Sequence, residues 1–198
     1  LVGRNGAGKS TLLELLAGLE RPTGGEVRVF GLDPVRDPVG ARRRVGWMTD
    51  DMAVWNLPID QHLRLLAPFY PTWDADLAAS LLDRFELGAH RQIGALSKGE
   101  QTRARLVMTL AWRPELVLLA EPATGLDVPA RRALLGTVLD VVRDGTRTVL
   151  ISSHQVDDVE RICDRVLLLE RGLLAGDGTP AEVAGPGRTL EERLAESR

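Results

Sequence analysis

Short apolar runs of strand length recur along the second half of this chain. Three of them are mostly apolar and cover residues 116–120, 148–152 and 166–169. A continuous apolar run of this length is typical of a strand that is buried on both faces of a parallel sheet. A helical stretch precedes each run. This alternation predicts an α/β fold, in which helices cover both faces of an open, mostly parallel sheet and run 116–120 is central.

The first half of the chain contains two shorter strand signals and one long helical block. Residues 26–30 read EVRVF after the turn sequence PTGG and predict an exposed strand. Residues 45–48 read VGWM and predict a short strand. Residues 59–110 have helical character with proline and glycine interruptions. Three aromatic residues in or beside this block are expected to be packing residues: Trp73, Phe85 and Trp112.

The helical block has no strand of its own, and this predicts how the chain is divided. We expect a single domain over residues 1–198, into which a helical subdomain, residues 55–110, is inserted. Residues 180–198 are expected to form a C-terminal helical tail.

Composition narrows the classes of protein. The 198 residues are 44% hydrophobic and 27% charged with a net charge of −3, which excludes a disordered or fibrous chain and gives no electrostatic case for binding nucleic acid. The longest apolar run, residues 116–120, is far shorter than the ~18–20 residues of a membrane helix. The single cysteine, Cys163, excludes an internal disulfide and fits a reducing cytosol. Only two of the 25 basic residues are lysines, Lys9 and Lys98, so both positions are of interest.

Lys9 lies in a phosphate-binding pattern. Residues 3–11 read GRNGAGKST and match GxxxxGK[ST]. Glycines let successive backbone N–H groups turn toward phosphate oxygens, Lys9 brings a compact charge to the β- and γ-phosphates, and the Ser10 hydroxyl is a suitable ligand for Mg²⁺. The apolar spacing that follows predicts a helix whose N-terminus favours anions. The residues expected to hold ATP here are Gly3, Asn5, Gly6, Ala7, Gly8, Lys9, Ser10 and Thr11.

Further along, five ordered segments resemble the motifs of the ABC ATPases. They are LSKGEQ at 96–101 (the signature motif), LVLLAEP at 116–122 (the Walker B strand), ATGLD at 123–127 (the D-loop), ISSH at 151–154 (the switch histidine) and VGWMTDD at 45–51 (the Q-loop). Residues 69–74, FYPTWD, and the lysine at position 98 are similar to the ATPases of ABC-2-type exporters, particularly the YtrB-like ATPases. The resemblance implies the fold of a P-loop NTPase.

Two residues are candidates for catalysis. Glu121 follows an apolar strand, so its carboxylate is expected at the carboxyl ends of the strands, where α/β folds bind ligands. There it would orient or deprotonate the attacking water. His154 ends the next strand and is expected to hydrogen-bond the γ-phosphate or that water.

The signature segment points to a second subunit. Ser97 and Gly99 precede a helix expected to run from Glu100 onward, so their N–H groups and the Ser97 hydroxyl predict an anion site. In the family, that site faces the nucleotide of a partner, and two protomers enclose two ATP molecules. The resemblance also implies a separate membrane permease, docked against apolar positions near the Q-loop, and hence a cytoplasmic chain held at the inner face of the membrane. Those positions are Leu63, Leu66 and Phe69.

The sequence departs from the family pattern at several positions. Ala120 stands where the Walker B strand ends in Asp, which predicts weaker Mg²⁺ binding. Asp50 occupies the Q-loop position. Its carboxylate is a hard oxygen ligand for Mg²⁺, so we expect it to replace part of the negative charge that is missing at Ala120. Glu100 replaces the Gln of the signature at the dimer face, and the resemblance implies that it contacts the nucleotide together with Ser97 and Gly99. Only Leu1 and Val2 precede the phosphate loop, so we expect that the N-terminal strands of the domain, and the aromatic residue that stacks on adenine, are missing.

Three functions remain open at this point. The first is an ATPase subunit that drives a separate permease. The second is a regulatory subunit that binds ATP but hydrolyses it poorly, which Ala120 favours. The third is an ATPase of the same superfamily that acts on ribosomes or DNA, against which the lack of a basic patch argues. The transported substrate and the choice between a homodimer and a heterodimer are not encoded in these motifs.

Overall fold

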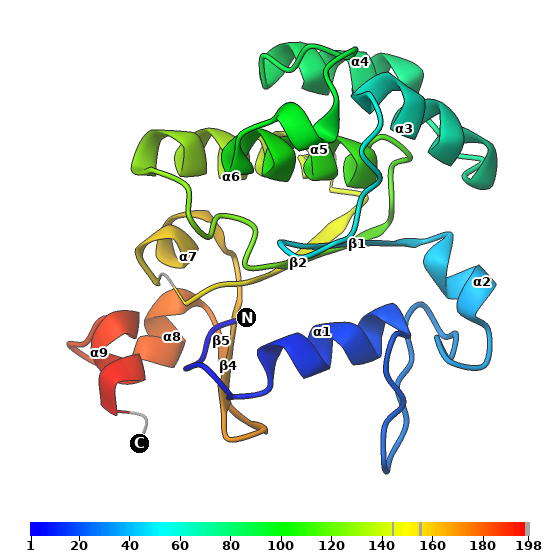
Figure 1. Ribbon diagram of the computed structural model, residues 1–198. Coiled ribbons are helices and arrows are strands. Elements are labelled where there is room, and N and C mark those ends of the chain that lie inside the picture. The colour runs from blue at the N-terminus through cyan, green and yellow to red at the C-terminus, as the bar shows by residue number, and fades with distance from the viewer. Residues whose placement is uncertain (144, 155, 197–198) are drawn as a thin grey trace.

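A parallel three-stranded sheet forms the centre of the molecule (Figure 1). The computed structural model describes residues 1–143, 145–154 and 156–196, without the side chains of residues 157–159. The strands are β1 (Val45–Thr49), β2 (Leu116–Ala120) and β3 (Thr148–Ser152), in the order β1-β2-β3. All pairs are parallel, with Ala120 in register with Thr49 and Ser152. The strands predicted at residues 45–48, 116–120 and 148–152 all form, and the central position of β2 is confirmed.

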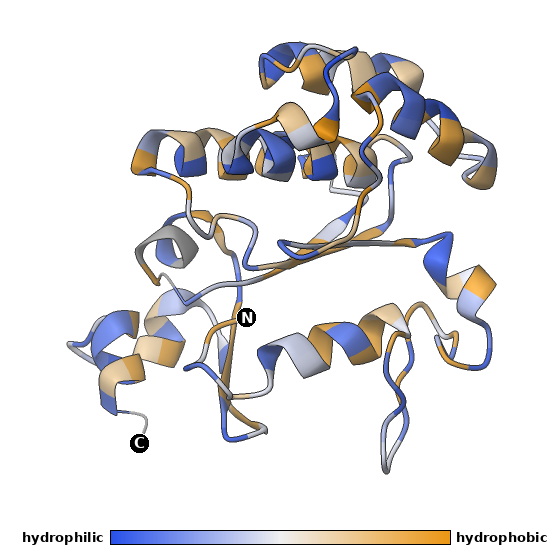
Figure 2. Ribbon diagram, in the orientation of Figure 1, coloured by the Kyte–Doolittle hydropathy of each residue, from blue (hydrophilic) through white to orange (hydrophobic). Residues whose placement is uncertain are grey.

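Alternate residues of β2 face different helices. Val117 and Leu119 belong to one apolar cluster, and Leu118 and Ala120 to another. The first cluster contains residues of α5 (Lys98–Leu110) and α6 (Val128–Val142), and the second contains residues of α1 (Lys9–Ala17). Helices therefore cover both faces, as expected from the alternating pattern, and Figure 2 shows both hydrophobic and hydrophilic residues around each flanking helix.

The secondary-structure elements between β1 and β2 are all helical, and they are joined by turns and irregular segments. Its elements, in chain order, are α3 (Ile59–Leu66), the 3₁₀ turn η1 (Ala67–Phe69), α4 (Ala75–Arg84), the 3₁₀ turn η2 (Ile93–Ala95) and α5. Phe85 and Trp112 are buried and Trp73 packs against the same core, so the three aromatic residues are packing residues, as predicted. The boundary of a subdomain at residues 55–110 stays a prediction.

The strand expected at 166–169 forms, but its main partner is different. β4 (Val166–Glu170) pairs antiparallel with β5 (Leu173–Gly178), a strand that the sequence pattern did not reveal. Val2 forms parallel bridges to both Ser153 and Leu168. Backbone hydrogen bonds from Val2 N–H to the Leu167 oxygen (2.8 Å) and from Ser153 N–H to the Leu1 oxygen (3.1 Å) insert this short segment between β3 and β4.

The strand predicted at residues 26–30 is wrong. Only Val29 forms a bridge, an isolated antiparallel one to Leu32, and its side chain is buried. Phe30 and Gly31 have φ values of 52° and 79°, which fold the chain back on itself after Val29. The local alternation is present, but a strand also needs a neighbouring backbone to pair with.

The remaining helices follow the sheet elements. They are α2 (Pro38–Arg42), α7 (Val156–Ile162), α8 (Pro180–Ala184) and α9 (Leu190–Glu196). Two of these helices, α8 and α9, lie within residues 180–196, where a helical tail was predicted. Within the described ranges, no helix has the length and apolar character needed to cross a membrane.

Candidate functional site

The phosphate loop leads directly into α1. Gly6 and Gly8 have φ values of 81° and 101°, a left-handed conformation that glycine adopts without steric cost. Gly3 is needed for a different reason, since a Cβ atom there would lie 2.5 Å from the Leu169 carbonyl oxygen. Gly8 is the N-cap of α1 and its cap position makes no side-chain hydrogen bond, so the helix N-terminus faces the loop without a protein carboxylate or hydroxyl capping it.

Lys9 is drawn into this loop rather than out to solvent. Lys9 is 7% exposed, and Nζ donates hydrogen bonds to the carbonyl oxygens of Gly3 (2.7 Å) and Arg4 (3.2 Å). Burial lowers the pKa of the Lys9 ammonium, and the negative charge of Glu121 opposes that shift. The ammonium group therefore lies inside the curve of the loop, where the pattern predicted it.

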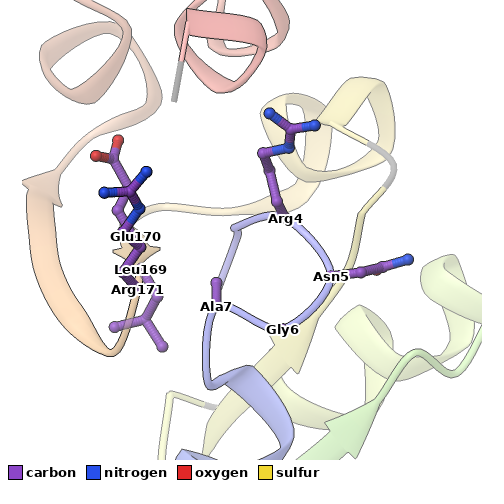
Figure 3. A pocket seen from close by; sticks show the side chains of 7 residues that line it. All are labelled: Arg4, Asn5, Gly6, Ala7, Leu169, Glu170 and Arg171. Carbon is purple, nitrogen blue, oxygen red and sulfur yellow. The ribbon is translucent and has the colours of Figure 1, made fainter. Parts of the chain in front are cut away.

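A cavity of about 290 Å³ opens beside the loop. Figure 3 shows Arg4 and Asn5 on the loop side and Glu170 and Arg171 on the other. The second wall is the turn between β4 and β5, and the Gly172 N–H joins it to the loop by a 3.0 Å hydrogen bond to the Ala7 oxygen. This wall could not be predicted from the sequence, because no local pattern places residues 169–171 next to residues 4–7.

Glu121 and His154 meet at the ends of neighbouring strands. His154 Nδ1 lies 2.8 Å from Glu121 Oε2, although the two residues are 33 positions apart. Glu121 has a φ of 49°, which turns the chain sharply as it leaves β2. Its N–H donates to both the backbone oxygen (3.1 Å) and the hydroxyl (3.2 Å) of Ser152. Ser152 is thus a supporting residue that the sequence analysis did not single out.

The two metal donors expected from the sequence are both exposed. Ser10 is exposed at the start of α1, and Asp50 is exposed in the turn after β1, beside Asp51. Ala120 faces the α1 side of the sheet, so a methyl group lies where an acidic side chain would point toward the loop. No group of three or more His, Cys, Asp or Glu side chains suited to a metal occurs among the described residues. Mg²⁺ bound to a nucleotide needs only one or two protein ligands besides phosphates and waters, and both expected donors carry the oxygen atoms that this ion prefers. Ser10 and Asp50 therefore stay the predicted donors.

The signature segment is arranged differently from the expectation. α5 begins at Lys98 rather than at Glu100, and Ser97 is its N-cap. The Ser97 N–H donates to Glu100 Oε2 (2.7 Å), and the Ser97 hydroxyl accepts from the Glu100 N–H (3.3 Å). This is a capping box, which engages the Ser97 N–H within the segment, while the Ser97 hydroxyl accepts one bond and keeps its own hydrogen to donate. The anion site expected at Ser97 and Gly99 stays a prediction. Gly99 lies against the D-loop, where an added Cβ would contact Leu126.

The carboxylate of Glu100 makes the start of α5 sensitive to acid. The hydrogen bond from Arg91, followed by that from the Ser97 N–H, lowers the pKa of Glu100 from 4.5 to about 2. A lowered pKa in the folded state means that the stabilisation is complete above 4.5 and is lost as the pH falls toward about 2. We expect the stability difference between wild type and Glu100→Gln to shrink over that interval, measured as urea midpoints at a series of pH values. A constant difference would contradict this assignment.

The apolar positions expected to dock a partner divide into two groups. Phe69 is 71% exposed and Leu66 is half-buried. Leu63 is buried in the core of the helical region, so its expected role in docking is wrong. Its position on α3 explains the error, because the inner face of an amphipathic helix carries the same residue types as a docking face.

Known proteins resemble this chain along most of its length. The family model described as ABC transporter matches residues 1–124. The ABC transporter ATP-binding protein YtrB of Bacillus subtilis is 31% identical over 86% of this chain and 58% of its own length. The doxorubicin resistance ATP-binding protein DrrA of Mycobacterium tuberculosis is 31% identical over 92% of this chain and 57% of its own length. The chain therefore spans a little under three fifths of these two curated relatives.

A solved structure agrees with the sequence matches. The structure described as the ATP binding subunit of an ABC transporter superposes with a TM-score of 0.88 and 28% identity, over 98% of this chain and 85% of its own. This confirms the predicted P-loop NTPase fold, and the similarity to YtrB agrees with the subgroup expected from residues 69–74. On the family model, the relatives and the fold together, the chain belongs to the ABC transporter family.

Proposed function

We propose that this chain binds and hydrolyses ATP and thereby powers a separate membrane permease. The observation that carries the proposal is the pair Glu121–His154, 2.8 Å apart. The pair lies near the phosphate loop, because Val2 just before the loop forms a bridge to Ser153 and the charge of Glu121 acts on Lys9. A carboxylate paired with an imidazole beside a phosphate site is suited to activating a water molecule. The relatives YtrB and DrrA are ATP-binding proteins by name, which supports the choice of nucleotide.

The proposed mechanism assigns a step to each part of the site. Gly6, Gly8 and the N-terminus of α1 hold the phosphate chain by backbone N–H groups. Lys9 exchanges its hydrogen bonds to the Gly3 and Arg4 oxygens for bonds to phosphate oxygens. Mg²⁺, when held by Ser10 and Asp50, would neutralise charge on the phosphates. Glu121 accepts a proton from the attacking water or orients it, and His154 holds that carboxylate in place.

A dimer is part of the proposal because of where the signature segment lies. α5 covers the face of the sheet opposite α1 (Figure 1), so Ser97 and Gly99 belong to a different side of the fold from the phosphate loop. Two protomers in opposed orientation would place the start of one α5 against the nucleotide of the other. We propose that ATP draws the protomers together and that hydrolysis separates them, with the segment 97–100 releasing its capping box on contact.

The permease is proposed to bind beside β1 and α3. Trp55 and Phe69 are 69% and 71% exposed, and both lie in the helical region that follows the β1 strand. Large exposed apolar side chains of this kind are typical of interaction surfaces. We propose that they receive a cytoplasmic segment of the permease, which would hold the chain at the inner face of the membrane.

A second function is favoured by Ala120. With a methyl group facing α1 in place of a carboxylate, the chain would serve as a regulatory subunit that retains ATP but turns it over slowly. The two functions differ in one measurable quantity, the rate of phosphate release by the wild-type chain at saturating Mg²⁺ and ATP. Steady multiple turnover supports the first function, and nucleotide retention without turnover supports the second.

Restoring the carboxylate at position 120 is expected to lower the Mg²⁺ concentration that gives half-maximal hydrolysis by about tenfold, because a hydrogen bond to a charged group is worth ~1.5–3 kcal/mol. In Asp50→Ala the same concentration is expected to rise. The measurement is a Mg²⁺ titration of phosphate release, with Ala79→Asp on the exposed side of α4 as the matched control. An unchanged Mg²⁺ requirement in both Ala120→Asp and Asp50→Ala would show that neither position governs the metal.

A further inference from the structure

Segments 56–60 and 89–94 of the helical region form a clasp, in which the two run antiparallel and share backbone hydrogen bonds. Asn56 closes one end of the clasp, since its Oδ1 accepts from the Gly94 N–H at 2.9 Å. Trp55, one of the exposed residues proposed to contact the permease, directly precedes Asn56. A displacement of that surface residue therefore acts first on the clasp. The backbone bonds run from the Ile59 N–H to the Arg91 oxygen (3.1 Å), from the Asp60 N–H to the Ala89 oxygen (2.9 Å) and from the Ile93 N–H to the Leu57 oxygen (3.1 Å).

Arg91 connects the clasp to the start of α5. Its backbone oxygen belongs to the clasp, whereas its guanidinium forms an ion pair with the carboxylate of Glu100. Nη2 also donates to Glu100 Oε2 and to the Ala95 oxygen, at 3.4 Å each. Glu100 Oε2 accepts in turn from the Ser97 N–H at 2.7 Å, within the capping box. The clasp and the first turn of α5 thus share one carboxylate, and Arg91 is the largest cause of its lowered pKa.

The start of α5 also lies against the D-loop. A Cβ atom added to Gly99 would lie 3.1 Å from Leu126 Cδ2, and one added to Gly125 would lie 3.7 Å from Lys98 Nζ. Gly125 follows Glu121 by only four positions, so the D-loop is a direct continuation of the chain from the proposed catalytic carboxylate. A continuous line of contacts therefore joins the clasp, the first turn of α5 and the segment that begins at Glu121 within one protomer.

We propose that Arg91 is a positioning residue of the ATPase, which couples the surface at Trp55 to the carboxylate of Glu121 through the start of α5. The inference rests on the proposed function and deepens it, because it names a route by which contact with the permease regulates hydrolysis. Such coupling requires an element with two arrangements that both sites bias. Here that element is the first turn of α5. Arg91 fixes the Glu100 carboxylate in the capping box, and displacement of the clasp releases it, so that the turn shifts against the D-loop.

The first measurement separates turnover from binding. We expect Arg91→Ala to lower kcat for ATP hydrolysis about two- to thirtyfold, the range of a residue on a coupling route, with the dissociation constant of ATP unchanged. Arg91→Lys is expected to recover part of the rate, because it keeps a charge-assisted hydrogen bond to Glu100. The matched control is Arg84→Ala, which breaks the 2.6 Å ion pair between α4 and Asp140 of α6 and is expected to hydrolyse ATP at the wild-type rate. The side chains of the two arginines are similarly exposed, 43% for Arg91 and 45% for Arg84.

A second measurement follows the link itself. The side chain of Asn56 bonds to Gly94 and not to Glu100, so its influence on that carboxylate has to pass through Arg91. In Asn56→Ala we expect the pKa of Glu100, followed by NMR, to rise from about 2 toward 4.5. In Gln61→Ala, at an exposed position of α3, it is expected to stay where it is. In the Arg91→Ala background, Asn56→Ala is expected to cause no further change of that pKa.

The outcomes distinguish this inference from the proposed function. If the wild type hydrolyses ATP and folded Arg91→Ala does so at the same rate, the inference is wrong and the proposed function stands. A pKa of Glu100 that does not move in Asn56→Ala also overturns the inference, because the clasp then does not reach α5. If Arg91→Ala does not fold, Arg91→Gln replaces it in both measurements. Failure of the wild-type chain to hydrolyse ATP would overturn both proposals.

Discussion

Replacement of Glu121 by Gln is expected to lower the rate of ATP hydrolysis by about 10²- to 10⁴-fold, the usual contribution of a positioned general acid or base, while ATP binding is retained. The amide has nearly the shape of the carboxylate and keeps an oxygen that accepts from the His154 N–H, and the backbone N–H of residue 121 still donates to Ser152. It does not accept a proton from water at neutral pH. The measurement is phosphate release at saturating ATP, with the dissociation constant of ATP determined in parallel.

A matched control is available at the other end of the same strand. Glu115 precedes β2 and forms an ion pair with Arg44 at 2.5 Å, far along the strand from Glu121. Glu115→Gln is expected to hydrolyse ATP at the wild-type rate. His154→Ala should also be slow, and the double variant with Glu121→Gln should be little slower than either single variant, because the two side chains act as a unit. Fully additive losses would argue that the 2.8 Å pair has no common role.

Much of the fold and of the site follows from local sequence patterns. The phosphate loop is a contiguous pattern in which glycine spacing and the lysine determine the backbone path, so Gly6, Gly8 and Lys9 lie where the motif predicts. β2 is a continuous apolar run because both of its faces are covered by helices. Glu121 and His154 end adjacent parallel strands, so their proximity follows once the order of those strands is known.

Other features depend on contacts between distant segments, which no local pattern records. The sequence 26–30 alternates like a strand but pairs only through Val29, because pairing requires a neighbouring backbone. Gly3 is required by the Leu169 oxygen, which is 166 positions away and belongs to a hairpin that was not expected. Glu170 lines the cavity beside the loop for the same reason.

The signature segment shows why a single sequence pattern can have two structural meanings. The pattern S-x-x-E at Ser97 and Glu100 is a capping box as well as part of a family motif. The family motif alone does not show that the Ser97 N–H already has a partner, the acidic side chain three residues along the same helical turn. Leu63 was misassigned for a related reason, because an apolar residue on a helix looks the same whether it faces the core or a partner.

Lys9→Ala is expected to weaken ATP binding by about 10- to 100-fold, since a hydrogen bond to a charged group is worth ~1.5–3 kcal/mol and each 1.4 kcal/mol is a factor of ten. The ammonium is nearly buried and already lies inside the loop, held by the Gly3 and Arg4 oxygens, so binding requires only a change of partner and little reorganisation. Arg36→Ala, which removes an exposed cation paired with Asp33, is the control and should bind ATP as wild type does. Circular dichroism establishes that each variant is folded.

The most direct measurement is a calorimetric titration of the wild-type chain and of Lys9→Ala, each with ATP and with inorganic triphosphate. We predict one saturable site in the wild type for both ligands, because the loop recognises the phosphates, and a loss of affinity for both in the variant. Equal affinity of the two proteins, or a wild-type chain that takes up neither ligand, would contradict the assignment of this loop as the centre of the site.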